Sequence, residues 1–249
     1  MNRILSMITL IVLMVVPVSA TTINIPADYP TIQEGIDASV DGDTVLVAPG
    51  IYYENLILET EIVFASHAIY DDLDSDWLNN ENITGTIISG AEEPSDPNKG
   101  SCLIIRGGGF GYSGNPQPEI IGLTFQDGNG TSMIVVDCDP YPVRAGGAIL
   151  MYKAYPTIMY NRFINNGHDN DNLRAGRGGR IGGAMGHFAE DGVEFDEDRS
   201  FSSQNDNQNN NSTRDIPETL NIQNNYFENN ASGDGENFYS HGYEGSIDV

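Results

Sequence analysis

Three segments of this chain repeat one another. They begin at Pro118, Pro156 and Leu220 and read PEIIGLTFQDG, PTIMYNRFINNG and LNIQNNYFENN. Aligning them on their phenylalanines gives two columns of residues: Phe125, Phe163 and Phe227, then Asp127, Asn165 and Asn229 two positions later. Such self-similarity indicates units that stack on their neighbours and share one continuous core. The repeat therefore constrains the fold more than any other feature of the chain.

A second repeated element, Gly-Gly-Ala, shows where the repeat is interrupted. It ends at Ala148 and again at Ala184; the next aligned phenylalanine follows 15 residues after the first and 43 after the second, so the second copy holds 28 additional residues. Residues 190–215 account for most of them and are rich in Asp, Glu, Asn and Ser. Because such a segment cannot bury enough apolar surface to order itself, we expect a flexible loop there.

Short runs rich in β-branched and aromatic residues occupy much of the remaining chain. Gly, Asn, Asp and Pro bound them, as is typical of strands. The runs are Thr44–Val47, Glu61–Ala65, Thr86–Ser89, Cys102–Ile105, Ile120–Phe125, Ala148–Met151, Thr157–Phe163 and Leu220–Phe227. No helical pattern between them is long enough to connect parallel strands as in a βαβ unit. The sequence therefore predicts an all-β parallel solenoid, in which each strand pairs with its equivalent one coil away.

Equivalent residues of successive coils must stack in such a solenoid. We expect Phe125, Phe163 and Phe227 to point into the core. The column of Asp127, Asn165 and Asn229 falls at the adjoining turn, where these residue types tolerate left-handed backbone and amides can hydrogen-bond along the stack. This second column has two interpretations, turn stabilisation and ligand contact. The frequency of Asn and Asp in turns favours the first.

One segment, Thr31–Val40, has the period of a helix instead. Ile32, Ile36 and Val40 are four residues apart and would share one face of that helix. The end of a solenoid exposes unpaired strand edges and an open core, which must be covered. We therefore expect this helix to cap the N-terminal end of the stack, with the three apolar side chains turned inward.

The residues around this helix resemble a known family. Ile23–Leu58 is similar to the start of secreted right-handed parallel β-helix proteins of the pectin lyase-like superfamily, and Gly42–Glu54 carries their GDTV-x-V-x-PG-x-Y-x-E pattern. The later GGAI, P-x-I and F-x-N-N elements resemble the repeats of the same group. The resemblance implies a right-handed β-helix over residues 21–249. It does not imply one activity, because the superfamily contains lyases, hydrolases, esterases and noncatalytic surface proteins.

The catalytic subfamilies differ in how well this chain matches them. It lacks the Gly-His-Gly and Arg-Ile-Lys motifs of polygalacturonases and the Gln-Asp-Thr motif of pectin methylesterases. Pectate lyases combine calcium-binding carboxylates with an arginine base. Resemblance to them implies calcium at Asp127, Asp137 and Asp139. The candidate bases are Arg106, Arg144, Arg162, Arg174, Arg177 and Arg180, none of which lies in that family's arginine-proline motif.

The N-terminal residues Met1–Ala20 have the pattern of a secretory signal peptide. Arg3 is followed by a nearly unbroken apolar run from Ile8 to Val16 and by small residues at the cleavage site. The run is shorter than the roughly 20 residues of a membrane-spanning helix, and no later segment is apolar enough to span. We therefore expect a secreted protein, extracellular or at the cell surface, whose mature chain has no membrane span.

Acidic residues dominate the composition. The chain has 11 Lys and Arg against 36 Asp and Glu, a formal net charge of -25. A field of this sign repels nucleic acid, so nucleic acid is excluded as a partner. The charge has two remaining interpretations: a solvated acidic surface that keeps the protein soluble, or carboxylates that hold calcium.

Two further residue types bear on the environment and the partner. Cys102 and Cys138 are the two cysteines, and a secreted protein permits a disulfide between them, although both can equally be buried thiols. Aromatic side chains that can stack on sugar rings are Tyr112, Tyr141, Tyr152, Tyr155, Tyr160 and Trp77. The four histidines, His67, His168, His187 and His241, have no metal-binding spacing and are interpreted as turn or surface residues.

These observations leave two functional hypotheses. The first is a noncatalytic, monomeric module of the cell surface or extracellular matrix that displays loops for adhesion or for binding a polysaccharide or cell-surface glycan. The second is a calcium-assisted, pectate lyase-like enzyme that degrades acidic glycans. The chain ends at Val249 without a closing helix, so we expect the solenoid to continue beyond it.

Overall fold

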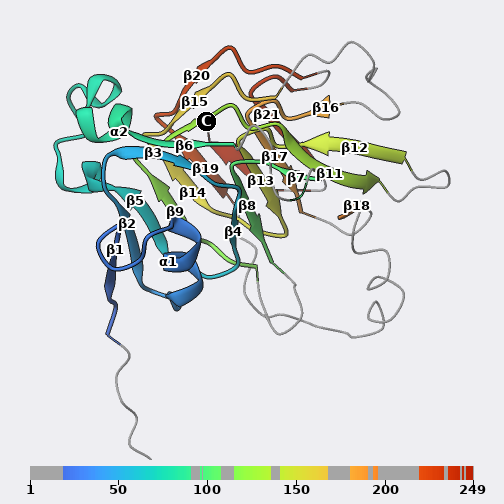
Figure 1. Cartoon of the computed structure of the whole chain (residues 1–249). Helices are drawn as coiled ribbons and strands as arrows, with labels where there is room; N and C mark the ends of the chain where they lie inside the picture. The colour runs from blue at the N-terminus through green and yellow to red at the C-terminus, as the bar shows by residue number, and fades with distance from the viewer. Residues whose placement is uncertain are drawn as a thin grey trace, which may run out of the picture.

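The fold is built from short strands in long parallel sheets, with few helices (Figure 1). The computed structural model describes residues 19–90, 96, 98–107, 115–135, 141–167, 180–189, 193–195, 219–232, 235–241, 243 and 245–248. Most of the expected signal peptide, most of the 190–215 insertion, and Asp137, Cys138 and Asp139 lie outside the described residues. No helix among the described residues is both long and apolar enough to cross a membrane.

Three parallel sheets share the core. Sheet A contains β1 (Thr22–Ile25), β2 (Thr44–Val47), β5 (Val63–Ser66), β9 (Glu119–Ile121), β14 (Thr157–Met159), β19 (Thr219–Gln223) and β22 (Ser246–Asp248). Sheet B contains β3 (Gly50–Tyr53), β6 (Thr86–Ser89), β10 (Thr124–Gln126), β15 (Arg162–Ile164) and β20 (Tyr226–Glu228). Sheet C contains β4 (Leu56–Leu58), β8 (Leu103–Arg106), β13 (Ile149–Tyr152), β17 (Met185–Phe188) and β21 (Phe238–His241).

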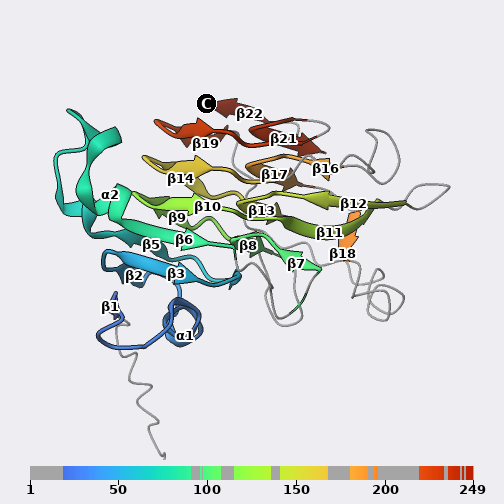
Figure 2. The same ribbon diagram turned by 45° about the horizontal axis from the view of Figure 1, so that its top comes forward.

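The chain visits the three sheets in the order A, B, C and then returns to A. β9, β10 and β13 form one such passage, and β14, β15 and β17 form the next. Each strand pairs in parallel with its equivalent in the following passage. Figure 2 shows the resulting layers, with α1 beneath β2 at one end and β22 at the other. The prediction of an all-β fold with parallel strands is confirmed.

The aligned phenylalanines stack inside these layers. Phe125 pairs in register with Phe163, and Phe163 with Phe227. The ring centroids of the first pair are 5.5 Å apart and those of the second 5.1 Å, with the planes 8° and 15° from parallel. Phe125 and Phe163 are fully buried, and Phe227 packs against the same core cluster. The three phenylalanines that the repeat aligns are therefore in direct ring contact.

Three runs that the sequence predicts to be single strands are each two strands joined at a corner. Ile120–Phe125 forms β9 and β10, and the two later repeats divide in the same way. The corner residues Gly122, Tyr160 and Asn224 have φ of 70°, 58° and 53°. One residue in this left-handed conformation turns the chain from sheet A to sheet B. The core residues Ile120, Leu123 and Phe125 are three and then two positions apart, so the inward alternation shifts by one residue at this turn.

The predicted column of Asp127, Asn165 and Asn229 lies at the next turn, but its side chains do not make the amide hydrogen bonds expected along the stack. Asp127, Asn165 and Asn229 adopt left-handed backbone, with φ of 58°, 55° and 52°. The amide hydrogen bonds along the stack are made by the following residues. Asn166 Nδ2 donates to Asn230 Oδ1 (3.1 Å) and to the Phe125 carbonyl (3.0 Å), while its Oδ1 accepts from Gly128 N (2.9 Å). Asn161 and Asn225 make an equivalent pair at the sheet A to sheet B corner.

Helix α1 (Ile32–Ala38) covers the N-terminal end of the stack, and two of its three predicted inward residues are buried. Ile32 is 0% exposed and Ile36 4%, whereas Val40 is 50% exposed. The expectation for Val40 is wrong, because the helix ends at Ala38 and Ser39 turns the chain into extended backbone. Val40 is therefore off the helix face that the sequence period assigned to it.

Polar side chains of the Gly42–Glu54 segment fasten this helix. The Glu54 carboxylate accepts hydrogen bonds from the first two helical amides, Ile32 N (2.9 Å) and Gln33 N (3.0 Å). Asp43, 5% exposed, accepts from Thr21 N and Val40 N at 2.7 and 3.0 Å. Since helix N-termini present free N–H groups and a partial positive charge, the Glu54 contacts stabilise α1 directly. Two acidic residues of the Gly42–Glu54 pattern, Asp43 and Glu54, therefore hold the capping helix in place.

Several elements were not foreseen from the sequence. They are α2 (Glu81–Gly85), the 3₁₀ turns η1 (His67–Tyr70) and η2 (Trp77–Asn79), and sheet D. Sheet D consists of β7 (Lys99–Gly100), β11 (Gly130–Val135), β12 (Tyr141–Ala145), β16 (Arg180–Ile181) and β18 (Val193–Phe195). β11 and β12 are antiparallel, and Met133 and Val143 pack on Ile104 and Leu150 of sheet C. Sheet D thus buries outward-facing apolar residues of sheet C.

Replacing Glu54 with Ala should lower the free energy of unfolding by about 2 kcal/mol, since two charge-assisted hydrogen bonds to the helix N-terminus are lost. Urea denaturation measures this. Glu119→Ala, at an exposed position of β9, serves as the matched control and should change stability by less than about 0.5 kcal/mol. Equal losses in the two variants would contradict the capping role.

Replacing Asn166 with Ala should cost about 2–5 kcal/mol, because Gly128 N and the Phe125 carbonyl are left buried without their partner. The neighbouring Asn165→Gly should be nearly neutral, since its left-handed backbone suits glycine. Thermal unfolding of both variants measures the difference. A larger loss of stability in Asn165→Gly than in Asn166→Ala would show that the amide hydrogen bonds of Asn166 are not the stabilising ones.

Candidate functional site

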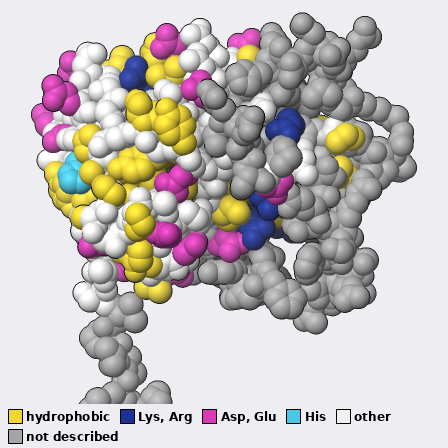
Figure 3. All heavy atoms as spheres, in the orientation of Figure 1, with side chains coloured by type: hydrophobic (Ala, Val, Ile, Leu, Met, Phe, Trp, Pro, Cys, Tyr) yellow, Lys and Arg dark blue, Asp and Glu magenta, His cyan; other side chains and the backbone are white. Residues whose placement is uncertain are grey.

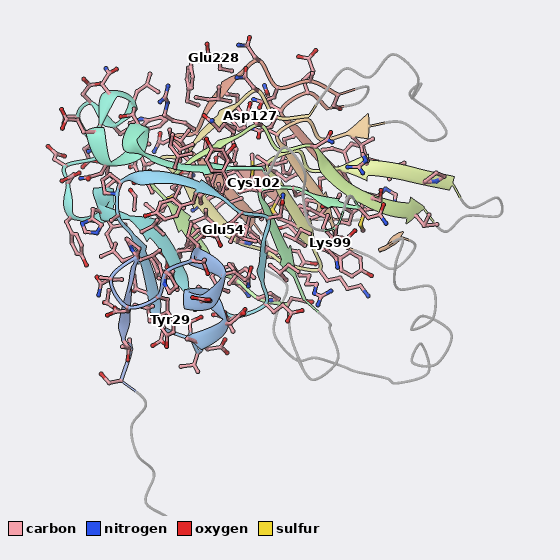
Figure 4. The ribbon with its side chains drawn as sticks, in the orientation of Figure 1. Tyr29, Glu54, Lys99, Cys102, Asp127 and Glu228 are labelled. Atoms are coloured by element: carbon pink, nitrogen blue, oxygen red, sulfur yellow. The ribbon has the colours of Figure 1, made fainter. Side chains whose placement is uncertain are left out.

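The three predicted calcium ligands are not assembled into a described site. Asp127 follows β10 and is exposed at its turn (Figure 4), whereas Asp137 and Asp139 lie outside the described residues. Within the described part of the chain, no three His, Cys, Asp or Glu side chains gather closely enough to hold a metal ion. The calcium hypothesis therefore stays a prediction.

Three of the candidate arginine bases have structural contacts. Arg106 forms an ion pair with Glu59. Arg144 donates from Nη1 to the Gly130 carbonyl (2.7 Å), and burial lowers the pKa of its guanidinium. Arg162 lies over the ring of Tyr226, with Cζ 5.6 Å from the centroid. Arg174, Arg177 and the side chain of Arg180 are outside the described residues.

The aromatic residues proposed for sugar stacking have different environments. Tyr155 is 3% exposed and belongs to the core. Trp77 and Tyr160 meet edge to face, with centroids 5.8 Å apart, at the corner that leads into β15. Tyr152 packs partly buried at the interface of sheets C and D. Tyr112 and the side chain of Tyr141 are outside the described residues.

The outer face of sheet B gathers exposed apolar, aromatic and polar side chains. Strand residues alternate between faces, so the neighbours of each inward phenylalanine point outward. We call this surface the sheet B platform; its accessible residues are Ile51, Tyr53, Ile87, Gln126, Arg162, Ile164, Tyr226 and Glu228. Tyr53 is 67% exposed and Ile51 54%. Figure 3 shows hydrophobic side chains gathered over β3 and β6 on this face.

Polar contacts hold one end of the sheet B platform in place. The Tyr226 hydroxyl donates to Glu228 Oε2 (3.2 Å), and Arg162 stacks on the Tyr226 ring. Arg162 Nε is buried without a hydrogen-bond partner. The Trp77–Tyr160 pair adjoins this row because Tyr160 lies two residues before Arg162. Between the two ends of the platform, Thr124 of β10 is buried and its hydroxyl donates to the Ile83 carbonyl of α2 (2.8 Å). Ile51 with Tyr53 and Arg162 with Tyr226 are therefore two accessible areas at opposite ends of one rigid parallel sheet.

Sequence reasoning did not identify Tyr53, Tyr226 and Glu228 as surface candidates. The indication was present in the aligned repeats: Arg162-Phe163-Ile164 and Tyr226-Phe227-Glu228 flank the buried column on both sides. Once the phenylalanines point inward, alternation places these neighbours on the opposite face.

His187 is buried in the core, which corrects its interpretation as a turn or surface residue. Its Nδ1 lies 3.0 Å from Ser240 Oγ, and the rings of Tyr155 and Tyr243 are each 5.4 Å from the imidazole centroid. Burial lowers the pKa of His187 from 6.5 to about 4, and the smaller effect of the Ala154 backbone acts in the opposite direction. The imidazole is therefore neutral at pH 7 and fills the core as an aromatic group.

Cys102 carries a free thiol that is fully buried among the strands (Figure 4). Its Sγ lies 3.4 Å from the Gln126 carbonyl. Burial raises the pKa of this thiol to about 12. Since the thiolate is the reactive form, Cys102 is a core residue and not a nucleophile.

Comparisons with protein-family models, with curated proteins and with solved structures found no significant match to this chain.

The buried His187 predicts a dependence of stability on pH. Between pH 6.5 and about 4 the unfolded chain binds a proton at this residue that the folded chain does not. The free energy of unfolding should therefore fall as the pH falls through this window, by up to about 1.4 kcal/mol per pH unit. Urea denaturation at several pH values should show a shallower slope for His187→Phe. Equal slopes in the two proteins would contradict the prediction.

Proposed function

We propose that this protein is a secreted, noncatalytic module of the cell surface or extracellular matrix that binds glycan on the sheet B platform. The observation that carries the proposal is the accessible aromatic and apolar surface at the two ends of this rigid parallel sheet, Ile51 and Tyr53 at one end and Tyr226 at the other. Pyranose rings have apolar faces that stack on such surfaces, and their hydroxyl groups require nearby donors and acceptors. The platform offers both.

We further propose that sheets A, B and C are the faces of one right-handed β-helix. The repeated A, B, C order and the in-register pairing of equivalent strands support this arrangement. Successive coils would then rise by about 4.8 Å. Right-handed winding is the strong preference for connections between parallel strands. The platform would run along the axis of this helix.

The chemistry of the platform favours a neutral glycan. Tyr53, Tyr226 and the isoleucines supply stacking surface, while Gln126, Arg162 and Glu228 can bond hydroxyl groups. The chain has a net charge of -25 and the platform itself includes Glu228, so a polyuronate would be repelled. A neutral polysaccharide avoids that repulsion.

The structural contacts of the arginines support the noncatalytic alternative over the lyase. An arginine base must reach the substrate proton in an accessible site. Arg106 is paired with Glu59, Arg144 bonds the Gly130 carbonyl, and Arg162 is stacked on Tyr226. These contacts account for three of the six candidate bases without catalysis, while Arg174, Arg177 and the side chain of Arg180 lie outside the described residues.

Replacing Tyr53 and Tyr226 together with Ala should weaken glycan binding at least tenfold, because two stacking surfaces are removed. Affinity electrophoresis with soluble glucan, xylan and mannan measures this. Tyr70→Ala is the matched control: Tyr70 is 69% exposed but lies in η1, away from the platform. Its affinity should equal that of the unchanged protein.

Two outcomes would overturn the proposal. The first is retention of the unchanged protein by none of the glycans, or equal loss of retention in Tyr70→Ala. The second is chemical: if incubation with polyuronates and calcium generates an unsaturated product whose absorbance a chelator abolishes, the protein is a lyase.

A further inference from the structure

Five segments of this chain match Asn-x-Ser/Thr, the acceptor pattern for N-linked glycosylation in secreted proteins. They begin at Asn82, Asn129, Asn210, Asn211 and Asn230. The transferase acts on chain that is still extended, so the fold decides which modified asparagine the finished protein can accommodate. Asn210 and Asn211 lie outside the described residues, whereas the other three have distinct environments.

Asn230 has no room for a sugar. It is 8% exposed, and its Nδ2 donates to the Phe163 carbonyl (3.0 Å) and to Asn237 Oδ1 (3.5 Å). Its Oδ1 accepts from the backbone and side-chain nitrogens of Asn166 at 3.0 and 3.1 Å. A sugar on Nδ2 would replace one of these hydrogen bonds and lie inside the stack. A chain modified at this position therefore could not pack Asn230 as the structure shows.

Asn129 is also confined. It is partly buried and lines, with Gly130 and Arg144, a hollow of about 10 Å³, which is the space of one water molecule. Thr131, the hydroxyl residue of the same pattern, is 1% exposed, and its Oγ1 lies 2.8 Å from Ser101 Oγ. The folded structure therefore disfavours a sugar at Asn129.

Asn82 differs from both. It is partly exposed in the first turn of α2, on the side of the stack away from sheet D (Figure 2). The next residue, Ile83, is 0% exposed and anchors the helix to the core. Asn82 Nδ2 donates to Asp71 Oδ2 (2.7 Å) at the protein surface. The amide of asparagine has two hydrogens and a glycosylated amide keeps one, so the contact with Asp71 survives modification.

We propose that Asn82 carries an N-linked oligosaccharide. The donor is a lipid-linked oligosaccharide of the secretory membrane, and a transferase of that membrane catalyses the step. A bond forms between Asn82 Nδ2 and C1 of the first sugar while the bond from C1 to the lipid pyrophosphate breaks. The pyrophosphate leaves with the electron pair, and Nδ2 loses one proton to a base of the transferase. This inference rests on the proposed secretion of the chain, but not on glycan binding by the sheet B platform.

Production of the full chain in insect cells, followed by peptide mapping after treatment with a peptide-N-glycosidase, tests the proposal. The glycosidase converts each glycosylated asparagine into an aspartic acid, which marks the modified positions. Asn82 should be marked, and Asn129 and Asn230 should not. Asn82→Gln and Thr84→Ala should each lose the mark, whereas Thr84→Ser should keep it because the hydroxyl remains. Asn79→Gln, at an exposed position outside the acceptor pattern, is the matched control and should keep the sugar at Asn82.

A second form of the chain, in which a leader of the host replaces Met1–Ala20, separates this inference from the proposed secretion. If only this form reaches the medium and Asn82 is glycosylated in it, the inference is supported and the secretory role of Met1–Ala20 is contradicted. An unmodified Asn82 in this form overturns the inference. A sugar at Asn230 in the folded, secreted protein also overturns it, because the fold would then not select among the acceptor asparagines.

Discussion

In-register pairing of parallel strands from successive passages of the chain is the constraint on which the rest of the structure depends. It places equivalent residues against one another, so a residue type suited to stacking is required again in each repeat. Phe125, Phe163 and Phe227 meet this requirement through ring contact, and Asn166 and Asn230 through amide hydrogen bonds. Gly147 and Gly183 meet it by having no side chain: a Cβ on Gly147 would lie 2.0 Å from the Gly183 carbonyl oxygen.

A stack of this kind needs a specific end, because its first strands would otherwise expose unpaired backbone groups. Here the end is closed by an apolar helix face and by polar side chains that replace missing strand partners. Glu54 bonds the first amides of α1, Asp43 joins its far end to the chain before β1, and Gln33 bonds both backbone groups of Ile57.

The outer faces of the sheets have unequal roles. Sheet C loses much of its outer surface to sheet D, whose Met133 and Val143 cover Ile104 and Leu150. Sheet B keeps Ile51 and Tyr53 exposed at one end and orders Arg162 and Tyr226 at the other. Inward positions are fixed by stacking, whereas outward positions are not, so the outward positions can carry recognition. This division supports the proposal that the sheet B platform is the surface that binds glycan.

The sequence by itself determined which residues are equivalent. Its repeat predicted the phenylalanine stack and the parallel strands, and the four-residue spacing of Ile32 and Ile36 predicted the capping helix, because these features depend only on periodicity. Only the tertiary structure decided the corners at Gly122 and Tyr160, the one-residue shift of the hydrogen-bonded ladder to Asn166, and the exposure of Val40. It also decided that His187 is buried beside Ser240, and that Tyr53 and Tyr226 share a surface. A single left-handed residue redirects the chain within one continuous β-rich run, and contacts between distant segments leave no local trace in the sequence.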